Sequence, residues 1–468
     1  MNVAPTPRPA PQPNPKPAKR MPRLGWLELI VVSQTALPAM MFVPSLLRFR
    51  FITRMLAFLL PLAAWAAYVL KGRRVAGGRA YPPAVCLGLA VGWLTLSIAN
   101  PWVNTLASAA CAVVITTAVL CPAFWAPAAI TDPRQLKRLL LVLLVCNGAS
   151  VLMGLAQVYR PETFRPPKII MFENDPDLEA GSTIVTDDGR KILRPPGLTD
   201  SPGGAAIGGL ISCALGLAVA LTPIAWWKRT AGMGIAVVGL TVLLYCQVRS
   251  MTITLILGLL LWGVLLALRG EAKKLATLGV LGAVLAMAAI GWVVRDGGSQ
   301  VMARFLAMFE EQATTVYYKN RGAFVEHALT EQLPMYPLGA GPGRVGMASF
   351  YFGNLLSPRD RAPLYGETQI DYWVINGGLP LVLLYPAALI LAFVVVVRTA
   401  IWSPDPEVAY WAGAVFVYAV AAGASLMGGP TFEGPPGVQF WVLLGALYGT
   451  QQQARVDALK AKTRIAEL

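Results

Sequence analysis

Residues 254–268 read TLILGLLLWGVLLAL and contain no charged side chain. Similar stretches recur along the 468-residue chain, which is 56% hydrophobic and only 13% charged, whereas soluble domains carry about 25% charged residues. A helix needs about 20 apolar residues to cross a bilayer. A transmembrane β-barrel would alternate apolar and polar residues, and residues 254–268 do not alternate. The sequence therefore predicts an all-α polytopic membrane protein.

About twelve transmembrane helices are predicted from the apolar stretches, with a large extracytoplasmic loop before the tenth. The predicted spans are 24–44, 54–70, 83–99, 104–129, 139–158, 203–224, 231–248, 251–268, 275–294, 371–397, 407–426 and 437–451.

Lysine and arginine in short loops predict the orientation, because cytoplasmic loops carry the excess of positive charge. With the N-terminus inside, the inner loops contain KGRR, PRQLKR and RGEAKK, and the outer loops near Trp102 and Pro430 contain no basic residue. Arg48, Arg50 and Arg54 break this rule, which indicates either a misplaced span or a basic rim at a functional site. The net charge of +15 is spread over many short loops, so we do not expect nucleic acid as a partner.

The spans divide the chain into seven parts. We expect a disordered Pro-rich basic cytoplasmic tail (1–23), helices 1–5 (24–158), an extracytoplasmic loop (159–202), helices 6–9 (203–294), a large extracytoplasmic loop (295–370), helices 10–12 (371–451) and a cytoplasmic C-terminal tail (452–468). The six cysteines lie in or beside apolar stretches, so they predict no disulfide framework and no metal site. We expect no cofactor.

Two arginines are candidates at the outer membrane face. Arg194 begins RPPGLTDSPGG, residues 194–204, which leads the chain into the sixth span, and Arg249 lies in the short outer turn QVRSM, residues 247–251. A single arginine at a membrane edge is usually an anchor. Arg249, however, interrupts two spans where positive charge is not favoured, and a guanidinium there could bind phosphate in bidentate fashion.

The second long loop holds several further candidates. Residues 317–333 predict an amphipathic helix that carries Arg321 and His327. His327 is a candidate general base or a packing residue. PLGAGPGRVG, residues 337–346, places Gly341 and Gly343 in a turn whose amides face an anion or in a plain connector; it does not follow a strand, as a dinucleotide motif would. In the first loop, Asp175 and Asp177 are read as a solvated turn rather than a metal clamp.

Glu367 and Asp371 lie four residues apart at the start of the tenth span and so share one helical face. A carboxylate at this depth costs free energy unless it is paired or used. The alternative is that the acidic residue stabilises the helix N-terminus through the macrodipole.

In this order, these segments resemble the O-antigen ligase and O-antigen polymerase superfamily of bacterial envelope glycosyltransferases. The resemblance covers roughly 139–400 and rests on RPPGLTDSPGGAA, VRSM, NRGAFVEHAL with PLGAGPG, and ETQIDYWVINGGLPL. Where the family ligases have His-Asn and a later acid, this chain has Glu367, Thr368 and Asn376. These departures place ligase activity in doubt and favour a polymerase.

The resemblance implies transfer of a glycan from a polyprenyl diphosphate donor to an acceptor sugar hydroxyl, without a metal. By resemblance, Arg194, Arg249 and Arg321 would bind the diphosphate and Glu367 would be the base, with His327, Gly341, Gly343 and Asp371 in support. It also implies a bacterial inner membrane, a site that faces the periplasm or cell exterior, and as partners polyprenyl diphosphate-linked glycans, the lipid bilayer, a chain-length regulator and a flippase.

Two alternatives to polymerisation remain open. One is ligation of the glycan to lipid A core or to protein. The other is a transporter or flippase of lipid-linked sugars, although such proteins usually keep ionisable residues at mid-bilayer and have repeated halves. Here the charges crowd the outer rim and no repeat is visible.

Overall fold

The computed structural model describes residues 25–72, 79–165, 182–185, 189, 191–199, 201, 203–310, 315 and 317–466, with the backbone alone at 47, 297–310, 320 and 466. The predicted tail 1–23 lies outside these residues. So do Asp175 and Asp177.

Helices account for nearly all of the described chain. The first half contains α1 (Trp26–Ala39), η1 (Met40–Phe42), η2 (Pro44–Phe49), α2 (Arg50–Leu70), α3 (Pro82–Leu96), η4 (Ser97–Ala99), α4 (Leu106–Leu120), α5 (Pro122–Ala129), α6 (Pro133–Tyr159), α7 (Pro161–Phe164), α9 (Ala205–Leu221) and α10 (Trp226–Cys246). Two short strands lie among the described residues, β1 (Thr183–Val185) and β2 (Lys191–Leu193), and they pair antiparallel with Ile184 opposite Ile192.

The second half begins with α11 (Arg249–Leu268) and α12 (Ala272–Glu310). A helical segment with two π-helical turns follows, made of η6 (Tyr318–Gly322), α14 (Ala323–His327), η7 (Ala328–Gln332) and α15 (Leu333–Met335). The chain ends with α16 (Gly346–Phe352), α17 (Gln369–Trp402), α18 (Pro406–Ser425), η8 (Thr431–Glu433) and α19 (Pro435–Ala466). α12 continues well past the predicted span end at 294, so the segment 295–370 begins as helix.

Nine helices in the described part of the chain are long and apolar enough to cross a membrane. They are Arg50–Leu70, Pro82–Ala99, Leu106–Ala129, Pro133–Tyr159, Trp226–Cys246, Arg249–Leu268, Ala272–Asp296, Gln369–Trp402 and Pro406–Ser425. Trp26–Phe42 and Ala205–Leu221 are apolar but shorter. The predicted span 437–451 lies in α19, which is not among the nine. The chain is thus an all-α, multi-pass membrane protein.

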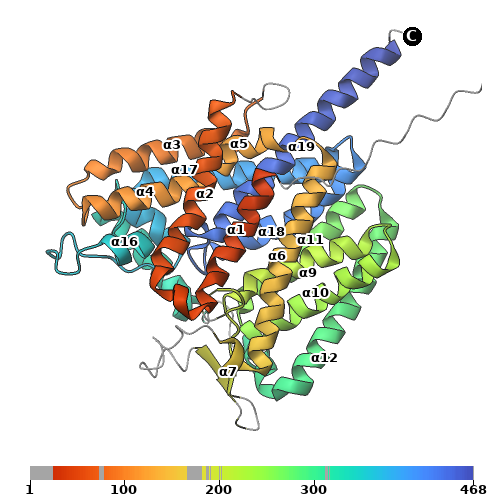
Figure 1. Cartoon of the computed structure of the whole chain (residues 1–468), viewed down its shortest axis with the longest axis horizontal. Coiled ribbons are helices and arrows are strands. Elements are labelled where there is room, and N and C mark those ends of the chain that lie inside the picture. The colour runs from red at the N-terminus through yellow and green to blue at the C-terminus, as the bar shows by residue number, and fades with distance from the viewer. Residues whose placement is uncertain are drawn as a thin grey trace, which may run out of the picture.

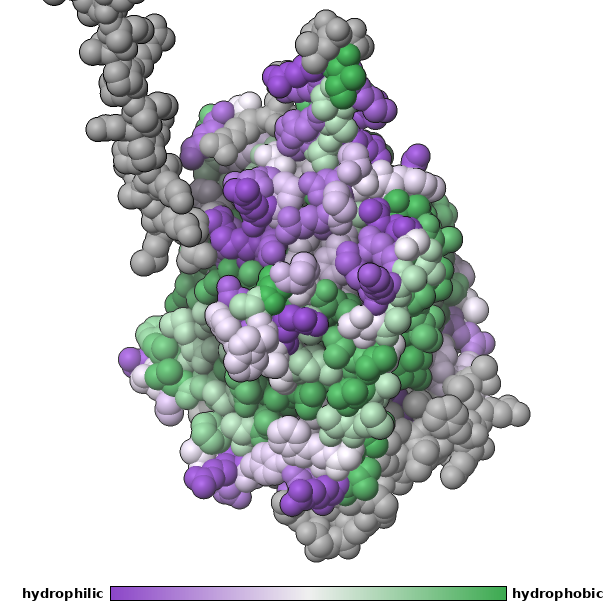
Figure 2. Space-filling view, turned by 90° about the vertical axis from the view of Figure 1, so that its right-hand side faces the viewer, coloured by the Kyte–Doolittle hydropathy of each residue, from purple (hydrophilic) through white to green (hydrophobic). Residues whose placement is uncertain are grey.

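The surface agrees with this assignment. Figure 2 shows a broad band of hydrophobic residues between two ends where hydrophilic residues gather. The β1–β2 hairpin and α7 lie at one end, and the C-terminal part of α19 projects from the opposite end (Figure 1). We name the end that carries the hairpin the hairpin end.

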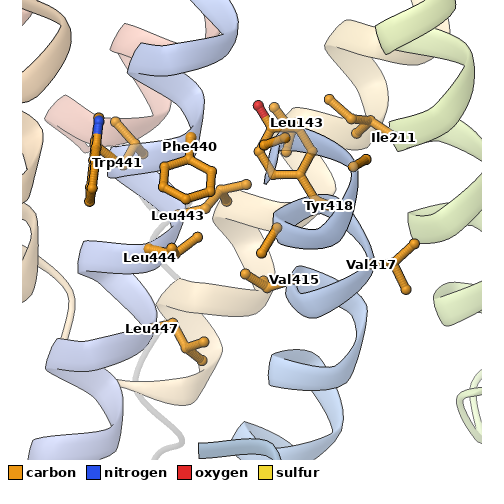
Figure 3. Close-up of a cluster of buried hydrophobic side chains, with 14 of the residues drawn as sticks. Leu143, Ile211, Val415, Val417, Tyr418, Phe440, Trp441, Leu443, Leu444 and Leu447 are labelled. Carbon is orange, nitrogen blue, oxygen red and sulfur yellow. The ribbon is translucent and has the colours of Figure 1, made fainter. Parts of the chain in front are cut away.

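A cluster of buried hydrophobic side chains lies where α18 and α19 pack together, with α6 and α9 beside them (Figure 3). In α18, 89% of the most apolar 18-residue stretch is buried, against 22% for the peripheral α12. Phe440 and Trp441 of α19 contact each other edge to face, with ring centroids 4.9 Å apart. Such aromatic pairs add stability beyond the area that they bury.

Glycines bring α9 and α10 into backbone contact. A Cβ atom on Gly239 would lie 2.8 Å from the carbonyl oxygen of Gly209, and one on Gly216 would lie 2.5 Å from that of Gly232. The two pairs are seven residues apart on each helix, so they repeat on one face. Close approach through small residues is a common way of packing helices in lipid, where apolar side chains gain little by meeting each other.

We predict that Gly239→Ala destabilises the protein by about 1–3 kcal/mol, because the added methyl group meets backbone that cannot move aside. Gly234→Ala on the same helix is the control, since a Cβ there has nothing within 4 Å. Thermal unfolding of the purified variants in detergent measures both. Equal unfolding temperatures for the two variants would contradict the proposed packing.

Candidate functional site

The stretch that begins with Arg194 is fixed against α6. Gln157 holds Gly197 from both sides: its Nε2 donates to the Gly197 carbonyl at 2.9 Å and its Oε1 accepts from the Gly197 amide at 2.9 Å. The Leu198 amide donates to Ser150 Oγ. Gly197 has a φ of +65°, which a residue with a side chain rarely adopts. The Pro-Gly turn therefore has a defined position at the hairpin end.

Arg194 lies beside the turn that joins α10 to α11. Its Nε donates to the Cys246 carbonyl at 2.9 Å. Gly203 fits between them, because a Cβ there would be 3.4 Å from both Arg194 Nη2 and the Cys246 oxygen. Arg249 is the first residue of α11, three residues after Cys246, and is half-buried. The fold thus brings the segments of Arg194 and Arg249 together.

Arg321 and Glu367 form an ion pair. Arg321 Nη1 contacts Glu367 Oε2, and the Tyr365 hydroxyl donates to Glu367 Oε1. The two charged side chains are 39% and 23% exposed. Glu367, the predicted base, is therefore paired with Arg321, one of the residues predicted to bind the diphosphate.

Asp371 caps the N-terminus of α17. Its Oδ2 accepts from the amides of Glu367 and Thr368 at 2.9 and 2.7 Å, and Thr368 Oγ1 accepts from the Asp371 amide. This is a capping box, in which each side chain satisfies the other residue's backbone amide. Asp371 is only 2% exposed, and in this structure its carboxylate stabilises the N-terminus of α17.

His327 and the glycines lie elsewhere around the site. The His327 side chain is 49% exposed and its Nδ1 is 3.1 Å from Glu331 Oε2. A Cβ on Gly341 would lie 2.6 Å from Val103 Cγ2, and one on Gly343 would lie 2.3 Å from the Ser108 carbonyl oxygen. The Gly343 amide donates to Asn376 Oδ1. The glycine stretch thus packs as a close connector against α4 and α17.

A cavity of about 510 Å³ opens beside these residues. Its walls come from α1, α2, α4, α6, α9, α16, α17, α19, the stretch before α9 and the connection between α18 and α19. The polar and charged side chains along it are Gln34, Thr35, Arg54, Asn147, Ser150, Thr199, Ser201, Tyr372, Asn376, Glu433 and Gln439. Arg54, one of the three arginines that break the orientation rule, therefore lines a cavity and also donates to the Tyr351 hydroxyl at 3.4 Å.

Glu433 was not among the predicted site residues. It ends η8, is half-buried at the cavity wall, and accepts from Gln369 Nε2 at 3.1 Å. Burial raises the pKa of its carboxyl to about 7, although the Gln369 hydrogen bond opposes the rise. The signal in the sequence was a lone carboxylate in a short loop, rich in glycine and proline, between two apolar helices.

The connection 426–433 links the separate parts of the site. The Gln369 amide donates to the Leu426 carbonyl, and Tyr317 donates to the Met427 carbonyl. A Cβ on Gly428 would lie 3.9 Å from Ser250 Oγ, next to Arg249. The connection therefore contacts the segments that carry Glu367, Arg321 and Arg249.

No protein-family model and no curated protein matches the chain. Among the described residues, no group of three or more His, Cys, Asp or Glu side chains could hold a metal ion.

The raised pKa of Glu433 predicts a stability that depends on pH. Because the folded-state pKa, about 7, lies above the ordinary 4.5, the folded protein binds the proton more tightly, and the free energy of unfolding falls as pH rises between these values. Glu433→Gln removes this dependence. The variant should gain about 1–3 kcal/mol relative to the wild type between pH 5 and pH 8, as measured by thermal unfolding. An equal difference at both pH values would contradict the assignment.

Proposed function

We propose that the chain is a glycosyltransferase of the O-antigen ligase and polymerase type. It transfers a glycan from a polyprenyl diphosphate donor to a sugar hydroxyl, with a second lipid-linked glycan as the favoured acceptor. The proposal includes twelve transmembrane helices in a bacterial cytoplasmic membrane, with α1, α9 and α19 added to the nine long apolar helices. Both chain termini then lie in the cytoplasm, and the hairpin end faces the periplasm or cell exterior.

The observation that carries the proposal is the convergence of three arginine-bearing segments and Glu367 around the connection 426–433. Arg194 and Arg249 belong to adjoining segments, and Arg321 contacts Glu367. Guanidinium groups bind phosphate oxygens through a planar fork of donors. Fixed donors that face a developing negative charge lower the barrier of its formation.

In the proposed reaction, the acceptor oxygen forms a bond to the anomeric carbon of the donor glycan. The bond between that carbon and the diphosphate oxygen breaks, and polyprenyl diphosphate leaves with the electron pair. Glu367 takes the proton of the acceptor hydroxyl, as a general base would. The arginines stabilise the charge on the departing diphosphate.

The ion pair between Arg321 and Glu367 suggests how donor binding prepares this step. A diphosphate competes with Glu367 for the Arg321 guanidinium, because both are anionic acceptors for the same fork. When Arg321 turns to the diphosphate, the Glu367 carboxylate becomes available to the acceptor hydroxyl. The base is then released only in the presence of donor.

Two alternatives differ from this proposal, one in the acceptor of the glycan and the other in replacing glycan transfer by transport. A ligase would use lipid A core or protein in place of a second lipid-linked glycan. A transporter would move the lipid-linked sugar without breaking the bond to the diphosphate. The cavity is compatible with either substrate movement or transfer, so the reaction products decide between them.

Arg249→Lys tests diphosphate binding. We expect polymer formation to fall about tenfold to 10²-fold, because an ammonium keeps the charge but loses the fork. The control is Arg398→Lys, where the guanidinium lies over Trp402 at the other end of α17; it should keep normal output. Full polysaccharide production by Arg249→Lys at normal expression would remove Arg249 from the site.

Glu367→Gln tests the base. The change keeps the shape of the side chain and removes its basicity, so transfer should fall about 10²- to 10⁴-fold while lipid-linked repeats accumulate. Glu331→Gln, in the same outer segment and 67% exposed, is the control. Polymer made by Glu367→Gln at the wild-type rate would leave Glu367 as a partner of Arg321 only.

The orientation is tested by cysteine labelling. Leu356→Cys lies at a position that is 93% exposed in the predicted large outer loop, and Leu459→Cys lies at one that is 65% exposed in the projecting part of α19. A membrane-impermeant maleimide should label Cys at 356 in cells with a permeabilised outer layer, and at 459 only after lysis of the inner membrane. The reverse pattern would invert the proposed topology.

A further inference from the structure

The lining of the cavity is mixed. Apolar side chains such as Met41, Phe58 and Ile207 lie among amide, hydroxyl and carboxylate groups from α6, α17, α19 and the α18–α19 connection. Its volume of about 510 Å³ lies within the usual range for a small-ligand site. A ligand of sugar size that presents both polar and apolar groups fits this lining.

Several polar groups on the wall keep hydrogen-bonding capacity in this structure. Asn147 uses Nδ2 towards the Leu143 carbonyl, so its Oδ1 remains available. Asn376 uses Oδ1, so its Nδ2 remains available. Ser150 Oγ accepts from the Leu198 amide and still has a proton to donate. Gln439 is 6% exposed, lines the cavity, and has no hydrogen-bond partner among the described residues.

Glu433 adds a carboxylate to this set. Gln369 fixes it through the Nε2 hydrogen bond, and the same amide accepts from the Phe432 backbone at 2.8 Å. The described residues give Glu433 no ion-pair partner. The titratable and charged groups that face it are Tyr372 and Tyr385 of α17, and Arg54 lies on the same cavity wall.

These groups favour one chemical class of ligand. The wall carries both donors and acceptors, and a sugar hydroxyl can donate and accept at once. At Glu433, a phosphate or diphosphate would face a carboxylate, whereas a neutral sugar would donate a hydroxyl to it. Arg54, the cation on the same wall, already donates to the Tyr351 hydroxyl. Buried polar groups that lack partners also cost free energy until a ligand satisfies them.

We propose that the cavity is a binding site for a neutral, hydroxyl-rich sugar head, with Glu433 as the carboxylate that accepts from its hydroxyls and Gln439 as an amide that becomes paired on binding. The assignment of this sugar as the acceptor glycan rests on the proposed function. Donor diphosphate and acceptor sugar then occupy adjoining places, the arginine segments on one side of the connection 426–433 and the cavity on the other.

The test measures binding without any transfer reaction. Thr35→Cys places a thiol at a half-buried position on the cavity wall. The full chain in lipid nanodiscs is treated with a small maleimide, and modification at residue 35 is followed by peptide mass spectrometry. The probes are octyl glucoside, octyl galactoside and octyl maltoside below their micelle concentrations, with octyl phosphate as the charged counterpart.

At least one glycoside should slow the modification, and octyl phosphate should not. In the same background at pH 8, where the Glu433 carboxyl is mainly ionised, Glu433→Ala and Gln439→Ala should each raise the half-protecting glycoside concentration. Glu433→Ala should raise it about tenfold or more, because a hydrogen bond to a charged group is lost. Glu331→Ala is the matched control and should leave the protection unchanged. Equal modification rates without probe establish that the variants keep the cavity.

Absence of protection by all three glycosides would overturn the proposal. So would equal protection by octyl phosphate, or full protection in both Glu433→Ala and Gln439→Ala. These outcomes decide whether the cavity binds a sugar, and a different experiment decides whether the chain is a transferase. If cells that lack the chain accumulate no lipid-linked glycan, the transferase proposal fails, whereas the protection result still decides whether the cavity binds a sugar.

Discussion

Gln369 makes the hydrogen bonds on which the arrangement of the site depends. It is fully buried at the first turn of α17, its backbone amide binds Leu426, and its side chain binds Phe432 and Glu433. A buried amide that lost these partners would carry a large desolvation cost. The α18–α19 connection is therefore held against the start of α17, and Glu367 lies two residues before that helix begins.

Two carboxylates lie on either side of Gln369 and have different surroundings. Glu367 is engaged by Arg321 and Tyr365, whereas Glu433 faces a cavity with an amide as its partner. Groups of one type that are set in different environments commonly take different parts in a reaction. In our proposal, the donor diphosphate releases Glu367 from Arg321, and Glu433 accepts hydrogen bonds from the acceptor sugar.

Sequence patterns were sufficient for the all-α, multi-pass class, because apolar periodicity and length do not depend on distant contacts, but they ended the helix α12 too early. They also selected Arg194, Arg249, Arg321 and Glu367 as candidates, whereas the contact between Arg321 and Glu367 arises only when the two segments that carry them meet in the fold. Local patterns could not distinguish an anion-binding turn from a connector at Gly341 and Gly343, since both need glycine. They missed Glu433, because a lone acid beside Gly and Pro resembles a solvated turn until its cavity is known.

The most direct test of the account is a reconstituted reaction. Lipid-linked glycan extracted from cells that lack the chain is added to the purified protein in liposomes, and both products are quantified by mass spectrometry. We predict that free polyprenyl diphosphate and lengthened glycan appear in equal amounts. Movement of intact lipid-linked glycan across the bilayer, without release of polyprenyl diphosphate, would contradict a transferase.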